Sequence, residues 1–328
     1  VKMINILVLG SNSFAGSCLV DYLLKKNFKV FGISRSKENN IKYQKNKNIK
    51  NFRFIKADIN KNLKNIEKII DRYKFELIVD FIGQGMVAES WDNPDQWFKT
   101  NVYNKVKLIN ILSNKKFLKK YIRVSTPEVY GTSRYKIKEN ISHNPSTPYA
   151  LTHSTIDKFL KLSFKKNRFP YVILRFSNFY GETQPMYRII PKTIRSIMMD
   201  KKLPLHGGGS SLRSFIYIDD FCEAIFKALS KSKNGEVYNV SSNELITIKD
   251  LIKKICLKMN KKFSEVVYIE KDRLGKDLKY FMDSKKANKY LKWKNKVNLD
   301  KGLEKVINWQ LANKKVLKKL KIQYMHKA

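Results

Sequence analysis

The chain has 328 residues, of which 43% are hydrophobic and 12% aromatic, so it is long enough and apolar enough to bury a full core. This composition excludes a disordered or fibrous protein, and no apolar run is long enough to cross a bilayer, so we expect a cytoplasmic protein with no membrane partner. The net charge of +39 comes from lysines spread along the whole chain, which predicts a solvated basic surface and no nucleic-acid partner.

Short apolar runs alternate with amphipathic helical stretches through the first half of the chain, a pattern that produces a parallel sheet covered by helices on both faces. The expected strands cover residues 4–9, 29–34, 52–56, 77–82, 121–124 and 171–176. The expected helices cover residues 14–26, 63–73, 94–112 and 149–166. The pattern predicts an α/β fold with a Rossmann-like doubly wound parallel sheet, whose ligand crevice lies at the carboxyl ends of the strands.

After residue 176 the regular alternation gives way to helices, loops and short strands, which indicates a smaller, interleaved α/β lobe for the substrate. We expect a dinucleotide-binding domain over residues 1–176, which also receives a strand near 235–241, and a mainly substrate-binding lobe over residues 177–328.

Two glycines, six residues apart, follow the first expected strand. Gly10 permits a tight turn, Gly16 permits close packing of a helix against the strand, and the helix N-terminus offers free amides to a pyrophosphate. A plain strand-turn-helix connection is the alternative interpretation. The cofactor-binding candidates in this segment are Gly10, Ser11, Asn12, Ser13, Phe14 and Gly16.

The second expected strand ends in Ser34 and Arg35, where a carboxylate would select the ribose diol of NAD. Arginine with serine can accept a 2′-phosphate instead, which favours NADP weakly over NAD, although Arg35 could equally be an ordinary surface cation. The turns after the third and fourth strands supply the further cofactor candidates Asp58, Ile59, Gly83 and Gln84.

Two motifs follow the fifth expected strand, Val124-Ser125-Thr126-Pro127-Glu128-Val129-Tyr130-Gly131 and Pro148-Tyr149-Ala150-Leu151-Thr152-His153. With the glycine segment they resemble the extended short-chain dehydrogenase/reductase family, most closely its nucleotide-sugar 4,6-dehydratases. The resemblance implies that Thr126 and Tyr149 flank the carbon-4 hydroxyl of a sugar linked to a nucleoside diphosphate. Tyr149 would take its proton as hydride leaves for NAD or NADP, and Glu128 would be the base that drives loss of water across carbons 5 and 6.

Two positions depart from the family pattern. His153 stands where the motif YxxxK has lysine; imidazole could still hydrogen-bond the nicotinamide ribose, and as imidazolium it could acidify Tyr149. Pro127 replaces the residue whose side chain protonates the departing hydroxyl in the enzymes with Thr-Asp-Glu. The alternatives are therefore a 4-epimerase, a 4-ketoreductase or a carbon-4 oxidase, and, from another class, a nucleotide-sugar-binding protein without catalysis.

Later segments resemble the family's substrate-binding elements. Asn178 lies in a segment similar to RxxNxYG, and Arg213 in one similar to RxFIxxxD. Arg273 and Lys276 lie in a segment similar to DRPGHDxRYxxD, with Lys276 in place of histidine. The resemblance implies that Asn178, Arg213, Arg273 and Lys276 contact the substrate, and a guanidinium suits a diphosphate because it donates two parallel hydrogen bonds.

Two further expectations concern partners and metals. Family members commonly dimerise through the helices that correspond to residues 94–112 and 149–166, so we expect a homodimer. His143 and His206 lack metal-ligand spacing with other histidines or cysteines, so we expect no metal.

Overall fold

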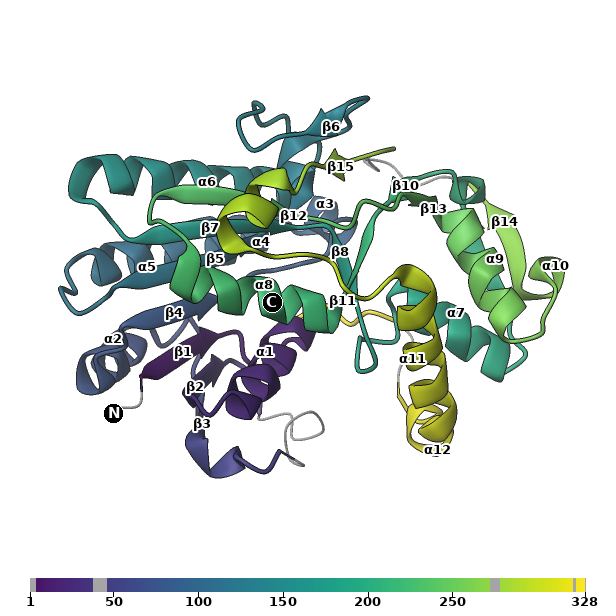
Figure 1. Ribbon diagram of the computed structural model, residues 1–328, viewed down its shortest axis with the longest axis horizontal. Helices are drawn as coiled ribbons and strands as arrows, with labels where there is room; N and C mark the ends of the chain where they lie inside the picture. The colour runs from purple at the N-terminus through teal and green to yellow at the C-terminus, as the bar shows by residue number, and fades with distance from the viewer. Residues whose placement is uncertain (1–3, 38–45, 272–277, 321–322, 328) are drawn as a thin grey trace.

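The computed structural model describes residues 4–37, 46–271, 278–320 and 323–327. Figure 1 shows a larger lobe built on a parallel sheet with helices on both faces, and a smaller lobe around α7, α9 and α11 at the side of the sheet. The expected α/β fold with a doubly wound parallel sheet is confirmed. No helix among the described residues is long and apolar enough to span a membrane.

Seven parallel strands form the central sheet in the order β12-β7-β5-β4-β1-β2-β3. The middle strands are buried over nearly their whole length because helices cover both of their faces. The order reverses direction between β1 and β4, and in such sheets the ligand crevice lies at this point, beyond the carboxyl ends of the strands. The strands are β1 (Asn5–Leu9), β2 (Lys29–Ser34), β3 (Phe52–Lys56), β4 (Leu77–Asp80), β5 (Lys120–Ser125), β7 (Tyr171–Phe176) and β12 (Glu236–Val240).

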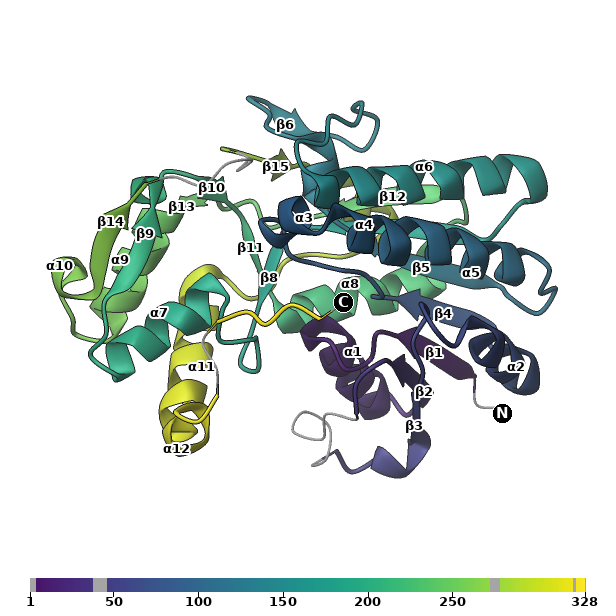
Figure 2. The same cartoon turned by 180° about the vertical axis from the view of Figure 1, so that it is seen from behind.

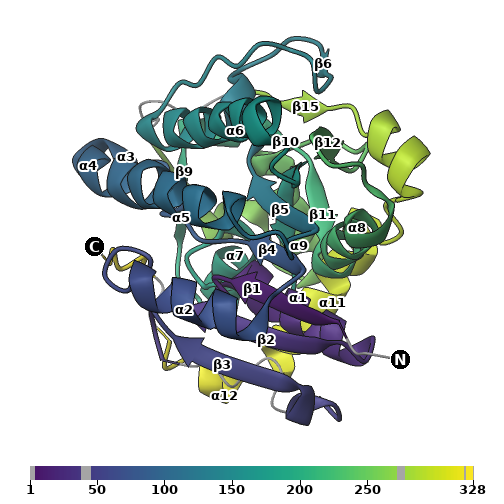
Figure 3. The ribbon, with the colours of Figure 1, turned by 90° about the vertical axis from the view of Figure 1, so that its left-hand side faces the viewer.

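Two helical layers cover the sheet. One face carries α1 (Phe14–Lys25) and α8 (Ile218–Lys231), which contact each other, and the other carries α2 (Leu63–Tyr73), α5 (Asn104–Ser113) and α6 (Pro148–Asn167). In Figure 3, α5 and α8 lie on opposite sides of β5. The apolar core is accordingly divided by the sheet into two clusters of buried side chains, one under each layer.

The helix expected over 94–112 is wrong as a continuous α-helix. Pro94–Trp97 (α4) is followed by a π-helical segment, Phe98–Tyr103 (η2), and only then by α5, with a short α3 (Glu89–Asp92) before them. The wider π turn places the polar side chains of Thr100 and Asn101 in the interior. Such interruptions occur often at functional sites, and this one lies beside the carboxyl end of β4.

The second lobe is built from the segment that follows β7. The chain returns to the large sheet through α8 and β12 and then leaves it again, so the two lobes alternate in sequence. Its larger elements are α7 (Ile189–Met198), β9 (Leu203–His206), α9 (Ile248–Lys258), α10 (Phe263–Val266), β14 (Val267–Glu270), α11 (Leu299–Ala312) and α12 (Lys314–Leu317).

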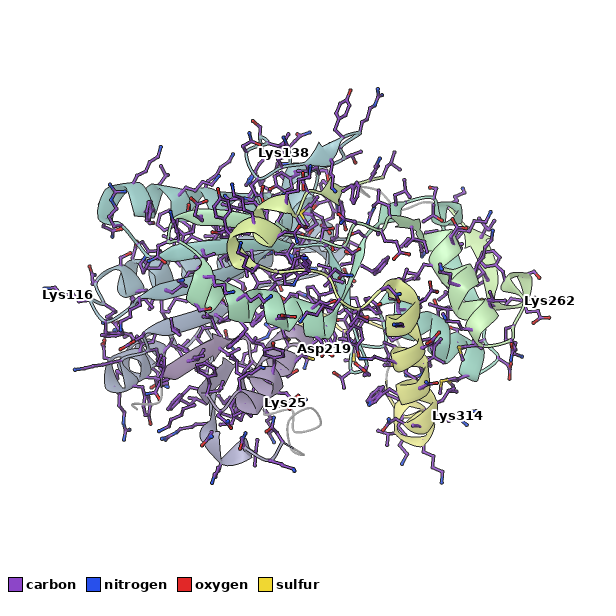
Figure 4. The ribbon with its side chains drawn as sticks, viewed as in Figure 1. Lys25, Lys116, Lys138, Asp219, Lys262 and Lys314 are labelled. Carbon is purple, nitrogen blue, oxygen red and sulfur yellow. The ribbon has the colours of Figure 1, made fainter. Side chains whose placement is uncertain are left out.

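Short elements complete the fold. The remaining strands are β6 (Lys136–Ile137), β8 (Asn178–Tyr180), β10 (Leu212–Arg213), β11 (Phe215–Tyr217), β13 (Ile246–Thr247) and β15 (Phe281–Met282). The remaining helical turns are η1 (Ile49–Asn51), η3 (Pro127–Tyr130), η4 (Gly207–Gly209) and η5 (Ala287–Leu291). Figure 4 shows lysines such as Lys116, Lys138 and Lys262 at widely separated edges of the molecule, so the positive charge is distributed over both lobes.

Candidate active site

The glycine segment forms a tight turn between β1 and α1. Gly10 has a φ of 79°, a left-handed conformation that favours glycine, and its amide donates to the carbonyl of Ile33 at 2.7 Å. A Cβ on Gly16 would lie 2.3 Å from the carbonyl oxygen of Gly10, so only glycine lets the helix approach this closely. Ser13 caps α1 by accepting from the amide of Gly16 at 3.0 Å, so the helix begins at the switch point of the sheet.

The other cofactor candidates surround this turn. The amide of Asn12 donates to Ser34 Oγ at 2.9 Å, and its side-chain amide donates to the carbonyl oxygen of Ser36 at 3.2 Å, which joins the ends of β1 and β2. Phe14 packs on Phe179 of the β8 segment, with ring centroids 6.0 Å apart. Ser11 is fully buried.

Side chains of the π-helical segment hydrogen-bond the turns after β3 and β4. Asn101 accepts from the amide of Gln84 at 2.7 Å and donates to Thr152 of α6 at 3.1 Å. A Cβ on Gly83 would lie 3.1 Å from the same Asn101 side chain. After β3, the carboxylate of Asp58 accepts from the amide of Asn60, and Ile59 is buried. The candidates Asp58, Ile59, Gly83 and Gln84 thus line the same edge of the sheet as the glycine turn.

The C-terminal tail, residues 323–327, reaches this edge. Figure 2 shows the chain running from α12 back toward the large lobe. The carbonyl oxygen of Lys327 accepts from Arg35 Nη2 at 3.0 Å and from Gln84 Nε2 at 2.8 Å. The ring of His326 stacks on Trp97 with centroids 5.1 Å apart. Two side chains expected to hold a cofactor therefore hold a backbone carbonyl of the tail.

The candidate catalytic side chains come from the end of β5 and the start of α6. Thr126 caps η3 by accepting from the amide of Glu128, and it hydrogen-bonds the hydroxyl of Tyr149. Burial, and then the charge of Glu128, raise the pKa of Tyr149 above its ordinary value, while the bond to Thr126 and the charges of Arg188 and Arg123 oppose that shift. The structure therefore brings Thr126, Glu128 and Tyr149 together.

His153 lies one turn after Tyr149 on α6, with ring centroids 4.6 Å apart. Its Nδ1 is 3.1 Å from Nη2 of Arg123, and both side chains are buried. Burial, followed by the charges of Arg123 and Lys105, lowers the pKa of His153 well below its ordinary value. Of the two forms considered for His153, burial and the two nearby cations therefore favour the neutral imidazole over the imidazolium.

The substrate candidates are only partly described. Asn178 Oδ1 accepts from the hydroxyl of Tyr280 at 3.2 Å, and the guanidinium of Arg213 lies 4.4 Å from the centroid of the same ring. Asn178 and Arg213 are thus held around one tyrosine at the junction of the two lobes. Arg273 and Lys276 lie outside the described residues.

Sequence reasoning missed three residues of the site: Arg123, Asn101 and Thr152. Arg123 carried a usable signal, because a charged side chain within the apolar run of β5 must find partners inside the protein. Asn101 and Thr152 carried none, because they meet only when the π-helical segment packs against α6.

The fold and the site define a class of protein: a Rossmann-type α/β enzyme with a glycine turn at the switch point and a tyrosine-threonine pair at the carboxyl ends of the strands. The model of the GDP-mannose 4,6 dehydratase family matches residues 7–306. A probable dTDP-glucose 4,6-dehydratase of Sinorhizobium fredii is 30% identical over 327 residues, which cover 94% of this chain and 93% of that protein.

Two solved structures extend the comparison. A dTDP-glucose 4,6-dehydratase from Bacillus anthracis in complex with NAD has a TM-score of 0.85 and 28% identity, covering 95% of this chain and 98% of that one. A UDP-glucuronic acid 4-epimerase from Bacillus cereus in complex with UDP-glucuronic acid and NAD has a TM-score of 0.85 and 27% identity, covering 94% and 100%. The chain belongs to the extended short-chain dehydrogenase/reductase family of nucleotide-sugar dehydratases and epimerases.

Proposed function

We propose that the protein is an NAD- or NADP-dependent nucleotide-sugar 4,6-dehydratase, which oxidises carbon 4 of a hexose linked to a nucleoside diphosphate and eliminates water across carbons 5 and 6. One observation carries the proposal: the hydroxyl of Tyr149 is hydrogen-bonded to Thr126 and lies close enough to Glu128 to be affected by its charge. The dehydratase relatives support the same reaction.

The residues present fit a dinucleotide. The positive φ of Gly10, the close approach of Gly16 and the capped start of α1 form a turn in which backbone, unobstructed by side chains, can approach a pyrophosphate. A bound nicotinamide dinucleotide would supply the hydride acceptor for this chemistry. The preference for NADP that Ser34 and Arg35 suggest stays a prediction, and the named structural relatives are complexes with NAD.

The chain's own residues then divide the proton transfers. Tyr149 accepts the proton of the carbon-4 hydroxyl, and Thr126 orients that hydroxyl and the phenol. The resulting ketone acidifies the carbon-5 proton, which Glu128 removes as hydroxide leaves carbon 6. Return of the carbon-4 hydride to carbon 6, which a bound nicotinamide would carry, and addition of a proton at carbon 5 would complete the reaction, whose sum is loss of one water. Asn178 and Arg213 are the described side chains that we propose for the substrate.

A carbon-4 epimerase is the second candidate, favoured by one specific feature. Pro127 is buried at the first position of η3 and has no group that could protonate a leaving hydroxyl. The purified protein is incubated with UDP-, dTDP-, CDP- and GDP-hexoses, and the masses of the products are measured by mass spectrometry. This experiment distinguishes a dehydratase from an epimerase. Loss of one water supports the dehydratase, an isomer of unchanged mass supports the epimerase, and recovery of every sugar unchanged contradicts both.

Glu128→Gln should stop the elimination and spare the first oxidation. Removing the carboxylate leaves no base for the carbon-5 proton, so we expect dehydration to fall by about 10²- to 10⁴-fold. Reduction of the bound cofactor by the sugar should persist, as measured by its absorbance in a single turnover. Glu67→Gln on α2 is the matched control, and equal loss of both steps in Glu128→Gln would show that this residue is not the elimination base.

Deleting residues 323–328 should tighten dinucleotide binding. The carbonyl of Lys327 occupies Arg35 and Gln84, so the tail must leave before these side chains can reach a cofactor. We expect the Kd to fall by about threefold to tenfold, because a larger fraction of molecules is competent to bind. Lys327→Gln keeps the carbonyl and is the control, and a weaker Kd in the deletion variant would show that the tail assists binding.

We also propose a homodimer formed by α5 and α6. These neighbouring helices and the π-helical segment before α5 expose large apolar side chains, among them Tyr103, Leu151 and Leu162. Light scattering should give the mass of two chains for the natural protein and of one chain for Leu162→Glu. A natural protein with the mass of one chain at micromolar concentration would refute the dimer.

A further inference from the structure

A buried group of charges lies beneath Tyr149 and His153. Asp80 at the end of β4 accepts from the ammonium of Lys105 on α5 and from the hydroxyl of Tyr121 on β5. The side chains of Asp80 and Lys105 are fully buried, and Arg123 on β5 is only 1% exposed. The charges of Lys105 and Arg123 both act on the Asp80 carboxylate, so this buried group of three residues has a net positive charge.

Arg123 hydrogen-bonds the ring of His153. Its Nη2 lies 3.1 Å from Nδ1 of the imidazole, and a guanidinium can only donate. Nδ1 must therefore accept, so the neutral ring carries its proton on Nε2. Among the described residues, Nε of Arg123 has no hydrogen-bond partner. Burying an arginine this deeply lowers stability, because the desolvation free energy of an ion exceeds what incomplete hydrogen bonding gives back. We therefore expect this charge to have a role in the site.

The charge of Arg123 also acts on Tyr149. The groups that affect this phenol are Glu128 from η3, Thr126 from the end of β5, Arg188 from the start of α7, and Arg123 from within the sheet. Of these, the hydrogen bond of Thr126 and the charges of Arg188 and Arg123 favour the phenolate. Arginine stays charged throughout the physiological pH range, so its contribution, unlike that of a histidine, does not change with pH near neutrality.

We propose that Arg123 is a positioning residue of the active site, which supplies the fixed positive charge and holds His153 as the neutral Nε2–H tautomer, so that the two residues together replace a single lysine. His153 then offers one N–H to a ribose hydroxyl, and Arg123 stabilises the Tyr149 phenolate from below. The assignment of this hydrogen bond to a cofactor rests on the proposed function, whereas the tautomer and the charge of His153 do not.

Nitrogen-15 imidazole NMR tests the proposal without any substrate. The chain has 4 histidines, and the signals of His153 are identified by their loss in His153→Gln. We expect a protonated Nε2 and an unprotonated Nδ1 from pH 8 down to pH 5. In Arg123→Met, which keeps the volume of the side chain, His153 should titrate closer to 6.5 or mix its tautomers. Titration near 6.5 in the natural protein, or an unchanged spectrum in Arg123→Met, would overturn the proposal.

Variants of Arg123, alone and combined with His153→Lys, test whether Arg123 supplies the charge and His153 the hydrogen-bond donor. Arg123→Met should lower kcat by about 100-fold and move the acidic limb of the pH profile, on which turnover rises as Tyr149 loses its proton, to higher pH, with a smaller change in the KM of the sugar. Arg123→Lys should restore part of kcat, and Arg123→Met with His153→Lys should restore at least tenfold, because the lysine then supplies both charge and donor. Arg53→Met on the exposed side of β3 is the control.

The two proposals fail separately. If no nucleotide sugar reacts but the NMR result holds, the proposed function fails and the Arg123–His153 assignment stands. If sugars react normally in Arg123→Met while His153 keeps its tautomer, the assignment fails and the function stands. If Arg123→Met does not fold, the spectrum of Arg123→Lys decides, since a lysine still donates to Nδ1 and should preserve the tautomer.

Discussion

Tyr149→Phe should abolish oxidation at carbon 4 while the protein still folds and binds its ligands. The phenol is the only group in the proposed mechanism that takes the proton of the carbon-4 hydroxyl, and phenylalanine keeps its ring against His153. Because a positioned acid or base contributes about 10²- to 10⁴-fold, we expect kcat to fall by at least that range. Steady-state turnover, with the Kd of the dinucleotide measured in parallel, gives both quantities.

The residue Tyr135, which is 82% exposed, provides the matched control, since Tyr135→Phe removes a hydroxyl from the surface and should leave turnover unchanged. Turnover of Tyr149→Phe within a few-fold of the natural protein would remove the phenol from the mechanism. Loss of dinucleotide binding along with turnover would instead assign Tyr149 a role in holding the cofactor.

Asp157→Ala should have the largest effect on stability. The Asp157 carboxylate on α6 accepts from Nη2 of Arg175 at 2.9 Å and from Ser125 Oγ at 2.9 Å. The side chains of Asp157 and Arg175 are fully buried, so removing the carboxylate leaves an uncompensated guanidinium in the interior. We expect the free energy of unfolding, measured in urea, to fall by about 3–5 kcal/mol.

The double variant Asp157→Ala with Arg175→Met should recover part of this loss, because it removes the unpaired charge as well. Asp300→Ala is the surface control: its pair with Lys254 is partly exposed, so the loss should be within about 1 kcal/mol. A loss below about 1 kcal/mol in Asp157→Ala would show that the pair adds little to stability. The network matters for the site because Ser125 directly precedes Thr126.

The sequence allowed the fold to be predicted because its signals are local. Apolar runs of strand length, helical periodicity and the glycines at 10 and 16 each depend on neighbouring residues, and the structure places β1, β2 and α1 within a residue of the expected bounds. The π-helical segment at 98–103 was not predictable in this way, since a wider turn changes the apolar periodicity too little over six residues.

The site was predictable only where a motif is contiguous. Thr126, Glu128 and Tyr149 lie in motifs that can be recognised from the chain alone. The state of His153 depends on Arg123, which is 30 positions away, and the contact of Arg35 with Lys327 spans 292 positions. Such pairs are set by how strands and helices pack, so a pattern of single residues could identify His153 as a departure but not its neutral form.

The most direct measurement follows a deuterium atom. A nucleoside diphosphate hexose with deuterium at carbon 4 is incubated with the purified protein. The mass of the product and of its fragments is then measured by mass spectrometry, which locates the deuterium. We expect loss of one water and the label at carbon 6, because the hydride removed next to Tyr149 is returned there. Label recovered at carbon 4, or every tested sugar recovered intact, would contradict the account.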